Sequence, residues 1–221
     1  MPDTPPDASR PGLAIAPAQD TPATVGPQRE LLRSVFRDVL DRVAPAYSVA
    51  DWRPADAVRQ KGRGSCSQRL AVVEDEARAA GIAVRTHGLE VGAAFWHRRF
   101  PRHHRVLPAT VKLPWPEFLC DGAWLAAEDV FDPQPGRRFA NTGCNTLFEA
   151  LIDGIVTWRG DDPHGRDSLA RHVVADHGRF PDRAAFAAAC GTTFPRAVAP
   201  AVDAYLRIIT RDSLRRENET P

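Results

Sequence analysis

The sequence lacks the features that mark a membrane-spanning, zinc-binding or disulfide-bonded protein. Its apolar stretches are interrupted every few residues, and none reaches the ~18 residues that a membrane-spanning helix needs. The four cysteines are far apart and form no CxxC pair, which argues against a four-ligand zinc site and a disulfide scaffold. We therefore expect a chain with no membrane partner, no metal and no cofactor.

The sequence also lacks a large excess of positive or negative charge, and it lacks a secretory signal. The formal net charge is only +1, which argues against nucleic-acid binding by general electrostatic attraction. The first residues have neither the basic start nor the apolar stretch of a signal peptide. We therefore expect a cytoplasmic protein with reduced thiols.

Composition divides the chain into three parts. Residues 1–27 are rich in Pro, Asp, Thr and Ala and predict a disordered tail, because they cannot bury enough apolar surface to offset their ordering entropy. Residues 28–135 contain helix and strand patterns and predict the core, while residues 136–221 predict a helical extension packed on it. The order of these elements, with helices before and after a sheet, indicates an α+β fold rather than alternating βαβ units.

Apolar spacing predicts the individual elements. Residues 82–91 alternate as a strand does, and residues 109–131 predict a β-hairpin that turns at Asp121-Gly122. The candidate N-cap residues of a helix within 141–154 are Asn141, Thr142 and Asn145. The other predicted helices are 27–44, a short one within 49–64, 67–80, 165–180, 182–194 and 195–216.

Cys66 lies in a stretch of small residues directly before the helix predicted over 67–80. A helix N-terminus lowers the pKa of a thiol, and its free backbone N–H groups can stabilise an oxyanion. Ser65 and Ser67 are small enough to let a substrate carbonyl approach, so we count both as candidate substrate-binding residues. The alternative is structural, because free cysteines are among the most buried residues.

The order of motifs around Cys66 resembles the transglutaminase-like (papain-related) cysteine superfamily. The pieces that carry the resemblance are Gly64 with Cys66, "AAGIAVR" at 79–85, "WPE" at 115–117 and "DGAW" at 121–124. They extend over roughly residues 30–133. The resemblance implies a cysteine at the start of a helix that packs on an antiparallel sheet.

The resemblance also implies acyl transfer. In that chemistry a thiolate attacks an amide or thioester carbonyl, an acyl-enzyme forms on Cys66, and water or an amine takes the acyl group. The family's acidic residue, which orients the imidazole, falls on Glu128. The family's histidine falls on Leu113, so the position that should supply the base contains no imidazole.

Two other histidines are candidates for the missing base. If the strand over 82–91 pairs with the following strand, His87 falls opposite Trp115, and directly opposed side chains share a face of the sheet. His104, with its neighbour His103, belongs to a basic and aromatic loop that could fold back toward Cys66. The structural alternatives are a hydrogen-bonded histidine at a strand end and a solvated loop.

The same loop and strand contain candidate substrate-binding residues. Trp96 and Arg99 belong to the loop "FWHRRFPRHHRVLP", which we interpret as recognising a substrate or partner with an anionic group in preference to nucleic acid. Trp115 is expected to pack in the hairpin and shield the site. The expected substrate is a peptide, a protein or a carrier-linked acyl group.

Two functions therefore compete, and the order of motifs around Cys66 favours the first. The first is a cysteine-dependent acyltransferase, amidase or peptidase that acts through Cys66. The second is a non-catalytic transglutaminase-like module that uses the same cleft to bind a peptide or carrier protein, and Leu113 in the histidine position favours it. A nucleic-acid-contacting protein that uses the basic loop is a third and weaker hypothesis.

Overall fold

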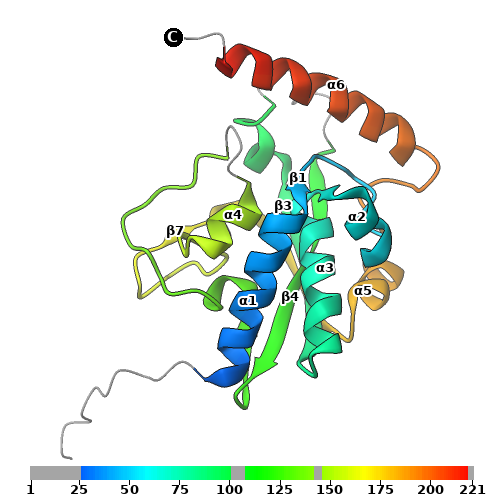
Figure 1. The fold of residues 1–221 in the computed structure, drawn as a ribbon. Coiled ribbons are helices and arrows are strands. Elements are labelled where there is room, and N and C mark those ends of the chain that lie inside the picture. Colours follow the sequence, from blue (N-terminus) through cyan, green and yellow to red (C-terminus); the bar gives the residue numbers. More distant parts are fainter. Residues whose placement is uncertain (1–25, 101–107, 142–145, 219–221) are drawn as a thin grey trace, which may run out of the picture.

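The computed structural model describes residues 26–100, 108–141 and 146–218, with side chains as far as residue 209. Helices pack on one antiparallel sheet, so the predicted α+β class is confirmed (Figure 1). The tail predicted over residues 1–27 lies almost entirely outside the described part of the chain. No described helix is both long and apolar enough to cross a bilayer.

Three helices precede the sheet, as the apolar spacing predicts. They are α1 (Pro27–Arg42), α2 (Ala55–Lys61) and α3 (Cys66–Ala79), and Figure 1 shows α1 beside α3. α3 begins at Cys66 because Ser65 and Gln68 form a capping box. The Ser65 hydroxyl accepts from the backbone N–H of Gln68, and the Gln68 side chain accepts from that of Ser65.

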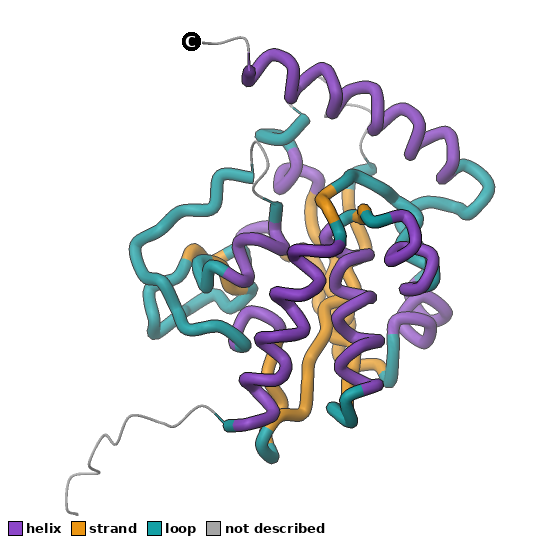
Figure 2. The backbone as a smooth tube through the Cα atoms, in the orientation of Figure 1, coloured by secondary structure: helices purple, strands orange, loops and turns teal. Residues whose placement is uncertain are grey.

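The sheet has four antiparallel strands in the order β5-β4-β3-β8. They are β3 (Ala83–Gly92), β4 (Thr110–Cys120), β5 (Ala123–Ala126) and β8 (Val173–Phe180). Figure 2 shows these strands behind the helices. The central strands, β3 and β4, pair without a register shift over their whole length, so alternate residues face opposite sides of the sheet.

The predicted hairpin turn is confirmed. Asp121 and Gly122 join β4 to β5, and both have positive φ, 51° and 82°. Two successive positive φ angles are typical of a type I′ turn, which matches the twist of the flanking strands. Local sequence therefore determines this end of the sheet.

The helix predicted over 165–180 is wrong. That segment contains the short strand β7 (Asp167–Ser168), the 3₁₀ turn η4 (Ala170–His172) and the strand β8. Gly178 has φ +80°, which an α-helix cannot contain, and β3 offers β8 an edge of unpaired backbone groups. The predicted helical extension therefore supplies one strand of the central sheet.

The C-terminal helices are present, with one error in capping. They are α4 (Leu147–Ile152), α5 (Arg183–Cys190) and α6 (Ala199–Asn218). Thr146 caps α4, whereas Asn141 has φ 50° and donates a hydrogen bond to the carbonyl oxygen of Phe95. The remaining short elements are β1 (Ala44–Pro45), β2 (Arg63–Gly64), η1 (Ala93–Trp96), η3 (Ala127–Asp129) and β6 (Val156–Thr157).

Two apolar clusters hold these elements together. In the main cluster Phe36 of α1 packs against Phe118 of β4, with ring centroids 6.0 Å apart. On the same face of the sheet, Gly88 approaches Phe186 of α5. The second cluster is much smaller and joins α6 to the rest through Phe100, Leu206 and Ile209. Among the side chains that the structure describes, α6 therefore has fewer buried ones than α1 or α3.

Candidate functional site

Cys66 lines a cavity of about 130 Å³ at the end of the sheet. Its walls come from the start of α3, the segment after β1, η1, the first residues of β4, and α6. Aromatic and aliphatic side chains dominate the lining, among them Phe95, Phe100, Leu113 and Leu206. The cavity is therefore suited to an apolar group, with Cys66 at its wall.

Hydrogen bonds to α3 fix the cavity wall that residues 46–50 form. The parallel pairing of β1 with β2 brings the chain after Pro45 alongside the residues that precede Cys66. The Gln68 side-chain amide then donates to the carbonyl oxygen of Ala50 (2.9 Å) and to the Ser48 hydroxyl (3.0 Å). Gln68, which is part of the capping box of α3, thus also holds the cavity wall.

The environment of Cys66 opposes ionisation. Burial, and next the nearby carboxylate of Asp51, raise the pKa of the Cys66 thiol to about 11. A backbone hydrogen bond at Ser67 and the charge of Arg69 act in the opposite direction but do not outweigh burial. Among the described residues, the position of Cys66 at a helix N-terminus therefore does not by itself lower the pKa of its thiol.

Asp51 is the acidic residue beside Cys66, and sequence reasoning missed it. It lines the same cavity, and burial raises its pKa to about 6 although Arg183 and a hydrogen bond with Ser67 lower it. Arg183 donates to the Ser67 hydroxyl (2.8 Å) and to Glu74 (2.6 Å). No motif marks Asp51, because it reaches the site only through the β1–β2 pairing.

His87 has the predicted register but different neighbours from those a catalytic base would have. It pairs with Trp115, as expected. Its Nε2 lies 2.7 Å from a carboxylate oxygen of Asp176, and its Nδ1 lies 3.9 Å from Glu117. Asp176 belongs to β8, a segment for which the sequence pattern predicts a helix. Among the described residues, His87 does not line the cavity, and His104 lies outside the described residues.

Glu128 and Trp115 contact each other instead of the cavity. The Trp115 indole N–H donates to the Glu128 carboxylate, and the backbone N–H of Trp158 lies 3.4 Å from it. Both side chains are buried, and burial raises the pKa of Glu128. Trp115 also packs edge-on against Trp158, 5.6 Å between ring centroids. In the structure these two residues therefore pack together with Trp158.

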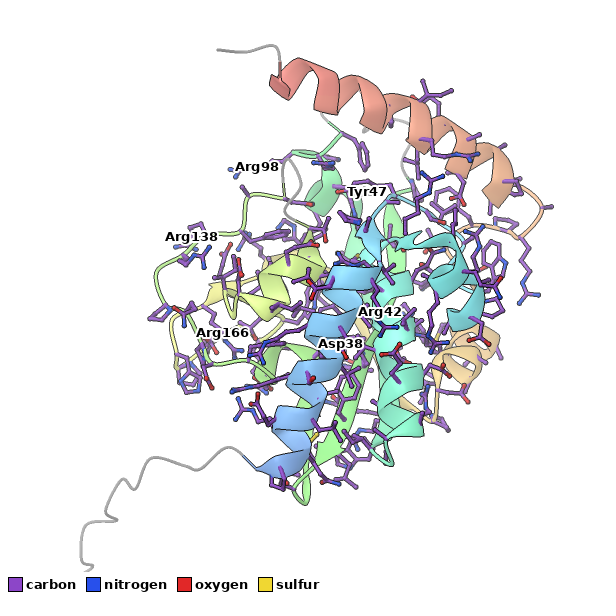
Figure 3. The ribbon with its side chains drawn as sticks, viewed as in Figure 1. Asp38, Arg42, Tyr47, Arg98, Arg138 and Arg166 are labelled. Carbon is purple, nitrogen blue, oxygen red and sulfur yellow. The ribbon has the colours of Figure 1, made fainter. Side chains whose placement is uncertain are left out.

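Four other predicted residues lie at the cavity or next to it. Ser65, Ser67 and Trp96 line it directly. The Arg99 guanidinium lies over the ring of Tyr47, 4.9 Å from its centroid, and Tyr47 is itself a lining residue. Figure 3 shows Tyr47 in the space between α1 and α6. These contacts place the start of the basic loop beside the cavity.

Leu113, which the resemblance in sequence aligns with a histidine, lines the same cavity as Cys66. It is buried and pairs with Leu89 across the β3–β4 ladder. Histidine does not occur among the described lining residues, and the described side chains include no cluster of three or more metal-ligating groups. Comparison of the chain with models of protein families, with curated proteins and with solved structures finds no match.

Proposed function

We propose that this protein is a non-catalytic, transglutaminase-like binding module whose Cys66 cavity receives an apolar group of a peptide or a carrier-linked acyl ligand. One observation carries the proposal. Leu113 and Cys66 line the same cavity, and the resemblance places an imidazole at the position of Leu113. The resemblance in fold is supported by α3 beginning at Cys66 and by the antiparallel sheet that follows it.

The protonation state of Cys66 favours binding over catalysis. With a pKa of about 11, only about one thiol in ten thousand is ionised at neutral pH. Asp51, the carboxylate beside the thiol, makes ionisation harder still because it would face a second negative charge. An acyl-enzyme on Cys66 would therefore form very slowly.

The size of the cavity sets the size of the ligand. An engineered apolar cavity of about 150 Å³ binds benzene, so the ≈ 130 Å³ here suits a group of up to about six carbon atoms. Burying six methylene groups contributes roughly 5 kcal/mol before the cost of association is subtracted. Apolar contact alone thus gives weak binding, and contacts of another kind must add to it.

The proposal is tested with a short acyl ligand and three variants. Hexanoyl amide binding is measured by calorimetry, and hydrolysis of a soluble hexanoyl thioester is followed in parallel. We expect Cys66→Ser to bind within about two-fold of wild type and Leu113→Trp, which fills the cavity, to lose binding by at least about ten-fold. Leu31→Trp, at an exposed position of α1, is the matched control.

Two results would overturn the proposal. One is thioester hydrolysis by the wild type that disappears in Cys66→Ser, which would establish acyl transfer. In that case variants of His103 and His104 would identify the base. The other is equal binding by wild type and Leu113→Trp, which would show that the cavity is not the site.

A further inference from the structure

The mostly apolar wall of the Cys66 cavity contains one carboxylate, that of Asp51. Asp51 and Lys112 are the charged residues of the described lining. The Lys112 ammonium is ion-paired with Glu90, a residue outside that lining. The positive charge of Lys112 is therefore compensated within the protein, and Asp51 gives the lining its negative charge.

The surroundings of Asp51 compensate its charge only in part. Burial raises its pKa to about 6, against the positive charge of Arg183 and a hydrogen bond with Ser67, and the negative charge of Asp203 adds to the rise. The Arg183 guanidinium is itself bound to the Ser67 hydroxyl (2.8 Å) and to the buried carboxylate of Glu74 (2.6 Å). A cation that binds beside Asp51 would therefore stabilise a carboxylate that burial destabilises.

Aromatic side chains form much of the remaining wall. They are Tyr47, Phe95, Trp96, Phe100, Phe194 and Tyr205. The Tyr47 and Phe100 rings meet edge to face with centroids 4.9 Å apart, and those of Phe95 and Trp96 do so at 4.8 Å. The negative face of an aromatic ring attracts a cation, and groups of such rings bind quaternary ammonium ions. The wall is therefore suited to a cation that carries apolar substituents.

The carboxylate and the aromatic wall are close enough to contact one small ligand. The charge of Asp51 acts on the Cys66 thiol, and Cys66 in turn acts on the Tyr47 hydroxyl. Burial raises the pKa of both Cys66 and Tyr47, so both are neutral at pH 7. Because the cavity holds only about 130 Å³, a group that fills it touches Asp51 and the rings together.

Two arginines near the cavity lie outside its lining. Arg69 is ion-paired with Glu149, and the Arg99 guanidinium lies over the Tyr47 ring, 4.9 Å from its centroid. Neither arginine belongs to the described lining. A ligand in the cavity therefore meets the Asp51 carboxylate and neither of these guanidinium groups.

We propose that the Cys66 cavity binds an N-methylated ammonium group, with the Asp51 carboxylate as its counter-ion and the aromatic wall against its methyl groups. The inference rests on the proposed function, because it names the group that the binding module receives. A primary ammonium would bring three N–H donors into a mostly apolar wall, whereas a quaternary ammonium has none to satisfy. The ionic contact supplies the binding free energy that apolar contact alone lacks.

Calorimetry with choline and 3,3-dimethylbutan-1-ol tests the proposal on the full chain. The two probes have nearly the same shape and differ in charge, because a carbon atom in the alcohol replaces the nitrogen atom of choline. We expect choline to bind at least about ten-fold more tightly at about pH 7. Leu113→Trp, which fills the cavity, should exclude both probes.

Asp51→Asn removes the charge and keeps the shape of the side chain. We expect this variant to bind choline at least about ten-fold more weakly while its affinity for 3,3-dimethylbutan-1-ol is unchanged. Asp41→Asn, at an exposed position of α1, is the matched control and should change neither affinity. In the wild type, the affinity for choline should fall below about pH 6, where Asp51 binds a proton, and the affinity for the alcohol should not. The wild-type titration does not depend on the folding of any variant.

Three outcomes would overturn the inference. If choline binds no more tightly than 3,3-dimethylbutan-1-ol while Leu113→Trp still excludes the alcohol, the proposed function stands and the ammonium site falls. If Asp51→Asn and wild type bind choline equally, Asp51 is not the counter-ion. If Leu113→Trp leaves the affinities for both probes and for hexanoyl amide unchanged, the cavity is not the site, and the proposed function falls with the inference.

Discussion

Residue 113 separates the two functions that the sequence leaves open. A histidine there would bring an imidazole to the cavity that Cys66 lines, whereas the leucine present contributes only apolar surface. The sequence identifies this position through the surrounding motifs, because the flanking Trp115 and the Asp121-Gly122 turn fix the register. Asp51 could not be found in this way, since its approach to Cys66 depends on tertiary contacts.

The substitution Leu113→His tests whether residue 113 lies close to the thiol of Cys66. We expect the variant to alkylate at Cys66 at least about ten-fold faster at pH 7, because an imidazolium beside a thiol lowers the pKa of the thiol. The substitution buries a polar ring and should cost about 1–3 kcal/mol of unfolding free energy. Leu113→Asn is the polar control, and equal alkylation rates for the two variants would contradict the placement.

The raised pKa of Asp51 predicts how the free energy of unfolding depends on pH. Its pKa is about 6 in the folded protein and near 3.8 when unfolded, so the folded state binds the proton more tightly. The stability that Asp51 contributes is therefore present below about pH 4 and is lost as pH rises to about 6. Relative to Asp51→Asn, the wild type should lose about 1–3 kcal/mol of unfolding free energy across that range.

Urea unfolding of both proteins at about pH 4 and about pH 7 measures this difference, and the comparison cancels the titration of the other carboxylates. A constant difference between wild type and Asp51→Asn at the two pH values would show that Asp51 titrates normally.

At the scale of elements, local patterns predict the fold well wherever a helix or hairpin is defined by neighbouring residues. α1 begins at Pro27 and α3 at a capping box, and β4 turns into β5 at Asp121-Gly122. β8 was missed because its partner, β3, lies about ninety residues earlier and provides the edge that makes it a strand. The same error hid Asp176, which binds His87.

The packing of α5 on β3 depends on a residue without a side chain. A Cβ atom at Gly88 would lie 2.5 Å from the ring of Phe186 and 2.9 Å from that of Phe180. We expect Gly88→Ala to lower the unfolding free energy by about 1–3 kcal/mol in urea denaturation. Gly160→Ala, where a Cβ meets nothing within 4 Å, should change it by less than about 0.5 kcal/mol. Equal effects would disprove the close contact.

α6 should open more readily than the helices on the sheet. The buried residues of the cluster that attaches it are Phe100, Leu206 and Ile209. We expect its amides to exchange with deuterium faster than those of α1 in native-state exchange. Equal protection of α6 and α1 without ligand would show that α6 unfolds only with the whole molecule.

At the scale of the whole molecule, the site is assembled from segments far apart in the chain. The start of α3, the segment after β1, η1, the first residues of β4, and α6 all meet at the Cys66 cavity. The sequence predicts each of these elements separately. Their meeting follows from tertiary packing, which local patterns do not encode.

We propose that Cys66 lines a binding cavity and is not an activated nucleophile. The most direct test is the rate of Cys66 alkylation by iodoacetamide as a function of pH, with the modified peptide identified by mass spectrometry. With a pKa of about 11, the rate should still be rising at pH 10. A rate that reaches its plateau below about pH 8 would mean an activated thiolate and would contradict the claim.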